Sequence, residues 1–194
     1  MIVKVVVMLI ALSLCWPMGA AAESKLKGKT KAELTPYELV VAEYVEALFN
    51  GCNFIKILEL SSKDYINRDL ETLLETMEAE QKARPTEDWK TKTHEQKLEL
   101  ARERWVVEHR RICMFADAKL FEYEIMRSEI SPDDPSRATV ANRLVSQDRF
   151  ANLDAGTEFE LYTLVKEDGQ WRFQQQVVIQ DVYGDQFKKW FPGQ

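Results

Sequence analysis

Residues 164–173 read LVKEDGQWRF, in which a charged turn at Glu167-Asp168-Gly169 joins two segments with apolar side chains at alternate positions. Asp-Gly between two such segments is typical of a β-hairpin, because glycine accepts the positive φ that a tight turn requires. In the strand before the turn, we expect one face to carry the side chains of Phe159, Leu161, Thr163 and Val165. In the strand after the turn, one face is expected to carry the side chains of Trp171, Phe173, Gln175, Val177 and Ile179.

Two more alternating segments precede this hairpin. The first is expected to point Phe121, Tyr123 and Ile125 to one face, and the second Val140, Asn142 and Leu144. Turn residues at 132–135 and 154–156 separate the segments. The whole pattern predicts an antiparallel meander of long hairpins after about Ala116.

The first half of the chain has helical periodicity instead. Thr35 offers an N-cap hydroxyl, Pro36 stands at the first helical position and Glu38 at the third, and Asn50-Gly51 ends the helix. One side of this helix is expected to carry Tyr37, Val40, Val41, Tyr44 and Leu48. Asn53 is expected to cap a short second helix with Phe54, Ile57 and Leu58.

Two longer helices are expected before the strands. The third helix covers about residues 69–82, and Pro85 follows it. A capping box of Thr93 and Gln96 opens a long helix that carries Leu98, Ala101, Trp105 and Ile112. Helices followed by strands predict an α+β fold, in which N-terminal helices pack on a curved antiparallel sheet.

Residues 1–22 have the parts of a secretory signal peptide. Lys4 precedes an uncharged segment, and the small residues Ala20, Ala21 and Ala22 form a cleavage site before Glu23. The expected product is an exported protein, periplasmic or extracellular. It consists of a flexible lead-in at 23–34 and a single domain at 35–194 with a short aromatic C-terminal tail.

Two alternatives to cleavage stay open. Cys15 is a candidate for lipidation, although Leu14 stands where a lipoprotein signal has a small residue. The segment is also a candidate for an uncleaved anchor, although Pro17 and Gly19 interrupt it and a span needs about 20 apolar residues. After cleavage no stable membrane span is expected.

The composition is acidic, with 26 Lys and Arg against 32 Asp and Glu, and loss of Lys4 with the signal changes the net charge from −6 to −7. Nucleic acids and anionic lipid surfaces bind concentrated positive charge, so neither is expected as a partner.

Cysteine usage fits an oxidising compartment. The exported chain keeps Cys52 and Cys113, and such a pair favours a disulfide. The alternative is two buried thiols that never meet.

Motifs for metal ions and cofactors are missing from the sequence. The histidines, His94 and His109, are about four helical turns apart, which is too far for one ion. There is no His-x-x-x-His, no Cys-x-x-Cys, no phosphate loop and no Rossmann fingerprint. No metal and no cofactor are expected.

The order of helices and hairpins resembles the nuclear-transport-factor-2-like superfamily, a cone-shaped α+β roll related to cystatin-like folds. Ala138-Thr139-Val140 after an acidic turn resembles the second long strand of that family, and residues 164–173 resemble its final hairpin. The resemblance covers about residues 35–182. It implies a cavity between helices and sheet and a possible homodimer through the sheet, but no single activity. The stretch 64–93 is longer than the family's helical lid.

Polar side chains interrupt the predicted apolar strand faces, and they suggest a partly polar cavity under the helices. The candidate ligand-binding residues are Tyr123, Asn142, Thr163 and Gln175 on the strands, with Trp105 and His109 above them on the long helix. The alternative is that these groups satisfy one another or that a bulge turns some of them outward.

Three function classes follow. The first is a non-catalytic binding module that holds a small molecule or peptide in this cavity. The second is a small isomerase or lyase, with His109 or Asp117 as base and Tyr123 as hydrogen-bond donor. The third is a protein-interaction module that uses the outer face of the sheet.

Overall fold

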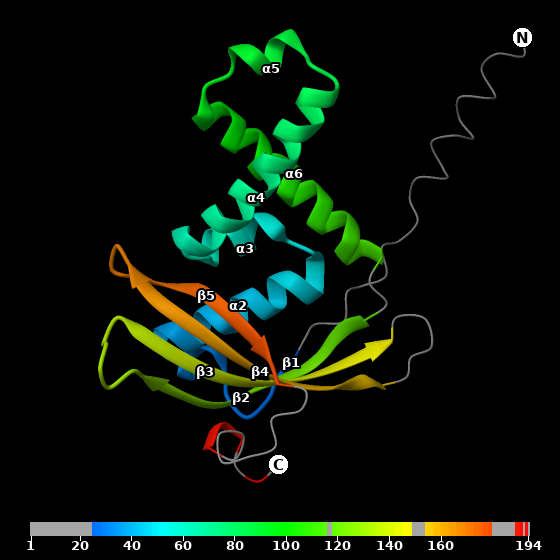
Figure 1. The fold of residues 1–194 in the computed structure, drawn as a ribbon. Coiled ribbons are helices and arrows are strands. Elements are labelled where there is room, and N and C mark those ends of the chain that lie inside the picture. The colour runs from blue at the N-terminus through cyan, green and yellow to red at the C-terminus, as the bar shows by residue number, and fades with distance from the viewer. Residues whose placement is uncertain (1–24, 116–117, 149–153, 180–188, 192, 194) are drawn as a thin grey trace, which may run out of the picture.

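The computed structural model describes residues 25–115, 118–148, 154–179, 189–191 and 193. Its sheet has five strands in the order β1-β2-β3-β4-β5. They span Lys25–Leu26, Ala118–Ile130, Arg137–Asp148, Asp154–Glu167 and Gln170–Val178. β1 pairs with β2 in parallel and the other neighbours are antiparallel. The predicted meander and the α+β fold class are confirmed, and the sheet curls beneath the helices (Figure 1).

The caps read from the sequence define the helices. Thr35 and Glu38 form the capping box of α2, which spans Pro36–Gly51. The side chain of Asn53 accepts from the backbone N–H of Lys56 and opens α3, Phe54–Leu60. Thr93 and Gln96 exchange two hydrogen bonds, at 2.9 and 3.3 Å, before α6, His94–Phe115.

The middle helices differ from the sequence prediction. α4 spans Lys63–Ala83, and it begins six residues earlier than expected because Ser62 accepts a hydrogen bond from the backbone N–H of Tyr65. A short helix that was not expected, α5, covers Glu87–Thr91. α4 and α6 run side by side and extend beyond the sheet, with α5 at their far end (Figure 1). Residues 64–93 therefore belong to a helical arm.

The segment expected as a flexible lead-in has regular structure. β1 lies within it, followed by a 3₁₀ helix, η1, at Lys31–Glu33. Lys29 donates to the buried carboxylate of Glu38 at 2.9 Å, and Ser128 of β2 donates to the same carboxylate at 2.8 Å. Burial alone raises the pKa of Glu38, but the hydrogen bonds from Thr35, Lys29 and Ser128 hold it below its usual value. One carboxylate thus joins this segment to α2 and β2.

The inner face of the sheet carries the predicted residues in β2 and β3 but not in β4. Tyr123, Asn142 and Leu144 are buried beneath the helices as expected. In β4 the buried inner residues are Tyr162 and Leu164, so the predicted face containing Phe159, Leu161 and Thr163 is the opposite one.

The predicted face of β5 changes sides within the strand. Leu164 pairs with Phe173 while Thr163 pairs with Gln175, so the intervening residue, Gln174, is a β-bulge. Phe173 is buried on the inner face, and the bulge sends Gln175 outward beside Thr163. The prediction that Thr163 and Gln175 share one interior space with Tyr123 and Asn142 is therefore wrong.

A second apolar cluster covers part of the outer face of the sheet. Trp190 and Phe191 of the C-terminal tail are buried there with Ala141 and Ile179, and Phe159 and Leu161 pack against them. The rings of Phe159 and Phe191 meet edge-on at 4.9 Å. The β4 side chains on both faces are thus covered, one set by helices and the other by the tail. Tyr183 and Phe187, the other aromatic residues of the tail, lie outside the described residues.

The predicted disulfide between Cys52 and Cys113 is present, with Cα atoms 5.8 Å apart. Cys52 is the C-cap of α2 and adopts a left-handed conformation with φ of 49°. Cys113 lies in the last turn of α6, so the bond joins the end of α2 to the end of α6.

A helix that spans a bilayer needs about 20 consecutive, mostly apolar residues. Within the described residues, no helix is both long enough and apolar enough to span a membrane. The predicted signal segment, 1–22, lies outside the described residues.

We expect loss of the disulfide to destabilise the domain substantially. The bond closes a 61-residue separation, for which the chain-entropy relation gives about 4 kcal/mol. Urea unfolding of the oxidised protein and of Cys52→Ser/Cys113→Ser should show a lower midpoint for the variant. Reductant should lower the midpoint of the wild type only, and an equal response from the variant contradicts the prediction.

Candidate functional site

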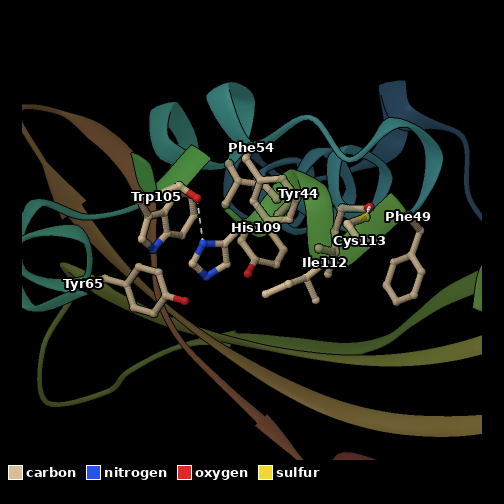
Figure 2. A pocket seen from close by; sticks show the side chains of 10 residues that line it. Tyr44, Phe49, Phe54, Tyr65, Trp105, His109, Ile112 and Cys113 are labelled. Atoms are coloured by element: carbon tan, nitrogen blue, oxygen red, sulfur yellow. Dashed lines mark hydrogen bonds between the residues drawn. The ribbon is translucent and has the colours of Figure 1, made fainter. Parts of the chain in front are cut away.

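A cavity of about 350 Å³ lies between α2, α3, α4 and α6. Its walls are mostly aromatic and aliphatic, and Figure 2 shows them from close by. The lining residues are Tyr44, Leu48, Phe49, Phe54, Ile57, Tyr65, Trp105, His109, Ile112 and Cys113. The helices supply all of them, while the sheet lies below. The disulfide closes one end of this wall through Cys113.

His109 is held in one orientation on this wall. Its ring stacks on Trp105, with centroids 4.0 Å apart, and Phe54 contacts both rings. Nδ1 lies 2.8 Å from the backbone carbonyl oxygen of Trp105. A carbonyl oxygen can only accept, so Nδ1 carries the proton and a neutral ring has an acceptor at Nε2. Nε2 points to the side where the hydroxyl groups of Tyr44 and Tyr65 lie (Figure 2).

Two tyrosine hydroxyl groups supply the other polar atoms of the cavity. Burial, the neighbouring Tyr65 and the charge of Glu160 raise the pKa of Tyr44 far above its ordinary value. Burial and the charge of Asp69 also raise the pKa of Tyr65. Both groups are therefore protonated at neutral pH and can donate hydrogen bonds. The cavity combines long apolar walls with one small polar end.

The predicted site residues separate into two groups. Trp105 and His109 line this cavity, which the helices form among themselves and which differs from the predicted space between helices and sheet. The strand residues are not among its lining. Tyr123 donates to Glu46 at 2.6 Å, Asn142 is buried in the sheet, and Thr163 and Gln175 lie on the outer face.

Sequence reasoning missed the aromatic residues that the helices contribute. The sequence predicts Tyr44 and Leu48 on the buried side of α2, and Phe54 and Ile57 on that of α3, but only as core residues. Tyr65 was missed because α4 was expected to begin after it.

The acid–base set of the isomerase hypothesis is not brought together among the described residues. The hydroxyl of Tyr123 is occupied by Glu46 and does not line the cavity. Asp117 lies outside the described residues. The same parts of the chain contain no group of three or more metal-ligating side chains.

A buried polar cluster lies under the helices in the sheet. Glu160 accepts hydrogen bonds from Tyr162 and from Gln176, and it is 2% exposed. Burial raises the pKa of Glu160 to about 7, although both hydrogen bonds lower it, and the charge of Glu158 adds to the increase. The ring of Tyr162 lies 6.0 Å from that of Tyr44, so the cluster lies behind the polar end of the cavity.

Asn142 pairs with Glu160 in the ladder and is fully buried. Neither its side-chain nitrogen nor its side-chain oxygen forms a hydrogen bond of normal geometry among the described residues, although the amide lies close enough to the hydroxyl of Tyr162 to lower in part the pKa of that group, which burial raises.

No family model and no curated protein matches this sequence. Among solved structures, the intermembrane space region of the chloroplast protein ARC6 is similar over 75% of this chain and 98% of that one. The identity is 15% and the TM-score is 0.31.

We expect Asn142→Leu to stabilise the fold by about 1 kcal/mol, because a buried amide without a hydrogen bond of normal geometry costs free energy that leucine of similar size avoids. Urea unfolding at neutral pH measures the change. Asn142→Ala serves as the control, since it removes the amide but leaves a cavity and should destabilise. A destabilised Asn142→Leu protein would show that the amide has a partner after all.

The stability of the fold should fall as the pH rises toward neutrality because of Glu160. Its folded-state pKa of about 7 lies above the value of about 4.3 for an exposed glutamate. Between about pH 4.3 and pH 7 the folded state therefore keeps the proton on Glu160, whereas the unfolded chain releases it. The contribution of this protonated carboxyl group to the free energy of unfolding is lost as the pH rises through that range. The loss amounts to about 3 kcal/mol between pH 4 and pH 8.

The test compares unfolding free energies of the wild type and Glu160→Gln at pH 5 and pH 8. The variant cannot ionise at this position, so its stability should decline less than that of the wild type. Parallel pH profiles of the two proteins rule out the buried acid as the cause.

Proposed function

We propose that this chain is an exported, non-catalytic binding protein that holds a small, largely apolar molecule in the cavity between α2, α3, α4 and α6. The observation that carries the proposal is the lining itself, in which aromatic and aliphatic walls surround one fixed imidazole nitrogen and two neutral hydroxyl groups. Small-molecule sites are typically concave and mostly apolar, with a few polar groups that set orientation.

The volume supports a small ligand rather than a peptide. About 350 Å³ lies at the lower end of the range of about 300–1,000 Å³ for small-molecule sites. A peptide binds along an extended groove or sheet edge, which is longer than this cavity.

The polar end supports a ligand with one hydroxyl or similar group. A ligand hydroxyl can donate to Nε2 of His109 and accept from Tyr65, whose side chain faces the same space. The rest of the ligand is expected against Phe49, Leu48 and Ile112, which offer no polar side-chain atom.

Export is supported by the disulfide between Cys52 and Cys113, because such bonds persist in oxidising compartments. It also agrees with the signal peptide expected at residues 1–22. The outer sheet face is a weaker candidate for function, since Trp190 and Phe191 of the same chain pack on it.

The binding test uses the fluorescent probe N-phenyl-1-naphthylamine, displaced by 1-naphthol or by 1-methylnaphthalene. These competitors have the same ring system but only 1-naphthol has a hydroxyl. We expect the affinity of 1-naphthol to be about fivefold higher than that of 1-methylnaphthalene, because one hydrogen bond contributes about 1 kcal/mol. His109→Phe keeps an aromatic ring on Trp105 but removes the acceptor, so it should abolish this preference.

A matched pair of variants tests the location. Ile112 and Val107 are both exposed on α6, at 68% and 66%, but only Ile112 lines the cavity. Ile112→Arg should weaken probe binding and Val107→Arg should not. The proposal fails if the two variants bind alike, or if the wild type does not distinguish the two competitors.

A further inference from the structure

A second concavity, of about 480 Å³, lies on the outer side of α3 and α6. It shares no lining residue with the aromatic cavity. Four apolar side chains form its floor, and its rim is charged. The lining residues are Ile55, Leu58, Glu59, Glu99, Arg102, Glu103, Val106 and Val107. We call it the α3–α6 groove.

Its apolar floor is unusually accessible to solvent. Ile55 and Val107 are 62% and 66% exposed, and they are two of the five large hydrophobic side chains exposed among the described residues. Leu58 and Val106 beside them are partly buried against the core. Two exposed aliphatic residues that face one groove mark an interaction surface more strongly than the same residues scattered singly.

The direction of the two helices places the charges at one end of the groove. Phe54 at the start of α3 contacts Trp105 and His109, so the start of α3 lies beside the later turns of α6. Glu59 at the other end of α3 therefore lies toward the earlier turns, which carry Glu99 and Glu103. The groove has an apolar end and an acidic end.

The acidic end has unpaired negative charge. Arg102 lies 3.4 Å from Glu99 and compensates that carboxylate. Glu59 and Glu103 form no ion pair within the described part of the chain. Two carboxylates on the rim therefore remain available, on a chain whose net charge is −6.

We propose that the α3–α6 groove binds a basic amphipathic helix of another protein. Grooves between helices accept a helix that inserts apolar residues spaced three or four apart, here against Ile55, Leu58, Val106 and Val107. Lysine or arginine on the next turn then meets Glu59 and Glu103. The overall negative charge attracts such a partner at long range and disfavours an anionic membrane surface.

The probe is a synthetic peptide of about 14 leucine and lysine residues, with the leucines on one helical face. A peptide of this length forms a marginal helix on its own. Its matched control keeps the leucines and replaces every lysine with glutamate. Titration into ¹⁵N-labelled protein locates the contact. We expect the lysine peptide to shift amide signals around Ile55 and Val107, with binding that weakens as NaCl is raised. The glutamate peptide should not bind there.

Substitutions on the groove then separate its two ends. Glu59→Lys/Glu103→Lys should weaken the lysine peptide by about tenfold through lost charge attraction and gained repulsion. Ile55→Ser/Val107→Ser should weaken it by a similar factor of about ten through lost apolar contact. Ile112→Ser is the control, because Ile112 is equally exposed on α6 but outside the groove. Circular dichroism checks that each variant is folded.

The remaining outcomes overturn the proposal. Equal binding of the two peptides, or signal shifts centred outside the groove, means that the surface does not recognise a basic helix. Sedimentation of the unliganded protein decides whether a second copy of the chain occupies the groove instead. In that case the wild type is a dimer and Val107→Ser a monomer.

Discussion

The side chain of Phe173 is contacted by aromatic rings from two helices and from the neighbouring strand. Tyr44 of α2 stacks on it at 4.3 Å, Tyr65 of α4 meets it edge-on at 5.0 Å, and Tyr162 of β4 lies 6.0 Å away. The backbone carbonyl of Phe173 also accepts from the N–H of Ser62 at 2.7 Å, immediately before α4. The helical layer is therefore attached to β5 at this residue, and the aromatic cavity lies above the attachment because Tyr44 and Tyr65 belong to both.

The sequence predicted the helices well because their ends depend on local contacts. The caps of α2, α3 and α6 are formed by side chains that bond to backbone groups three residues away, and such pairs can be read from the sequence. The start of α4 was missed since Ser62 lies before a charged stretch without clear periodicity, and its position is fixed also by β5.

The faces of β4 and β5 could not be assigned from alternation alone. Alternation identifies the inner face only when one face is polar, and β4 has large side chains on both, with Tyr162 inside and Leu161 outside. The second face is covered by Trp190 and Phe191, a contact between distant parts of the sequence. In β5 the bulge at Gln174 reverses the phase, and three consecutive glutamines give no pattern that marks it. The sequence therefore placed Thr163 and Gln175 on the wrong face, and the cavity of the structure is lined by helices and not by these strands.

The aromatic cavity and the α3–α6 groove use different sides of one helix. Ile112 and Val107 are five positions apart on α6, which corresponds to about 140° around the helix axis. The spacing of α3 from α6 is held by the contact of Phe54 with Trp105, and the end of α6 is tied to α2 by the disulfide. A partner in the groove and a ligand in the cavity would therefore contact different sides of a wall that is held at the middle and at the C-terminal end of α6. Two sites are coupled only when binding at both of them changes the arrangement of the wall that they share. A wall held in one arrangement therefore favours independent binding at the two sites.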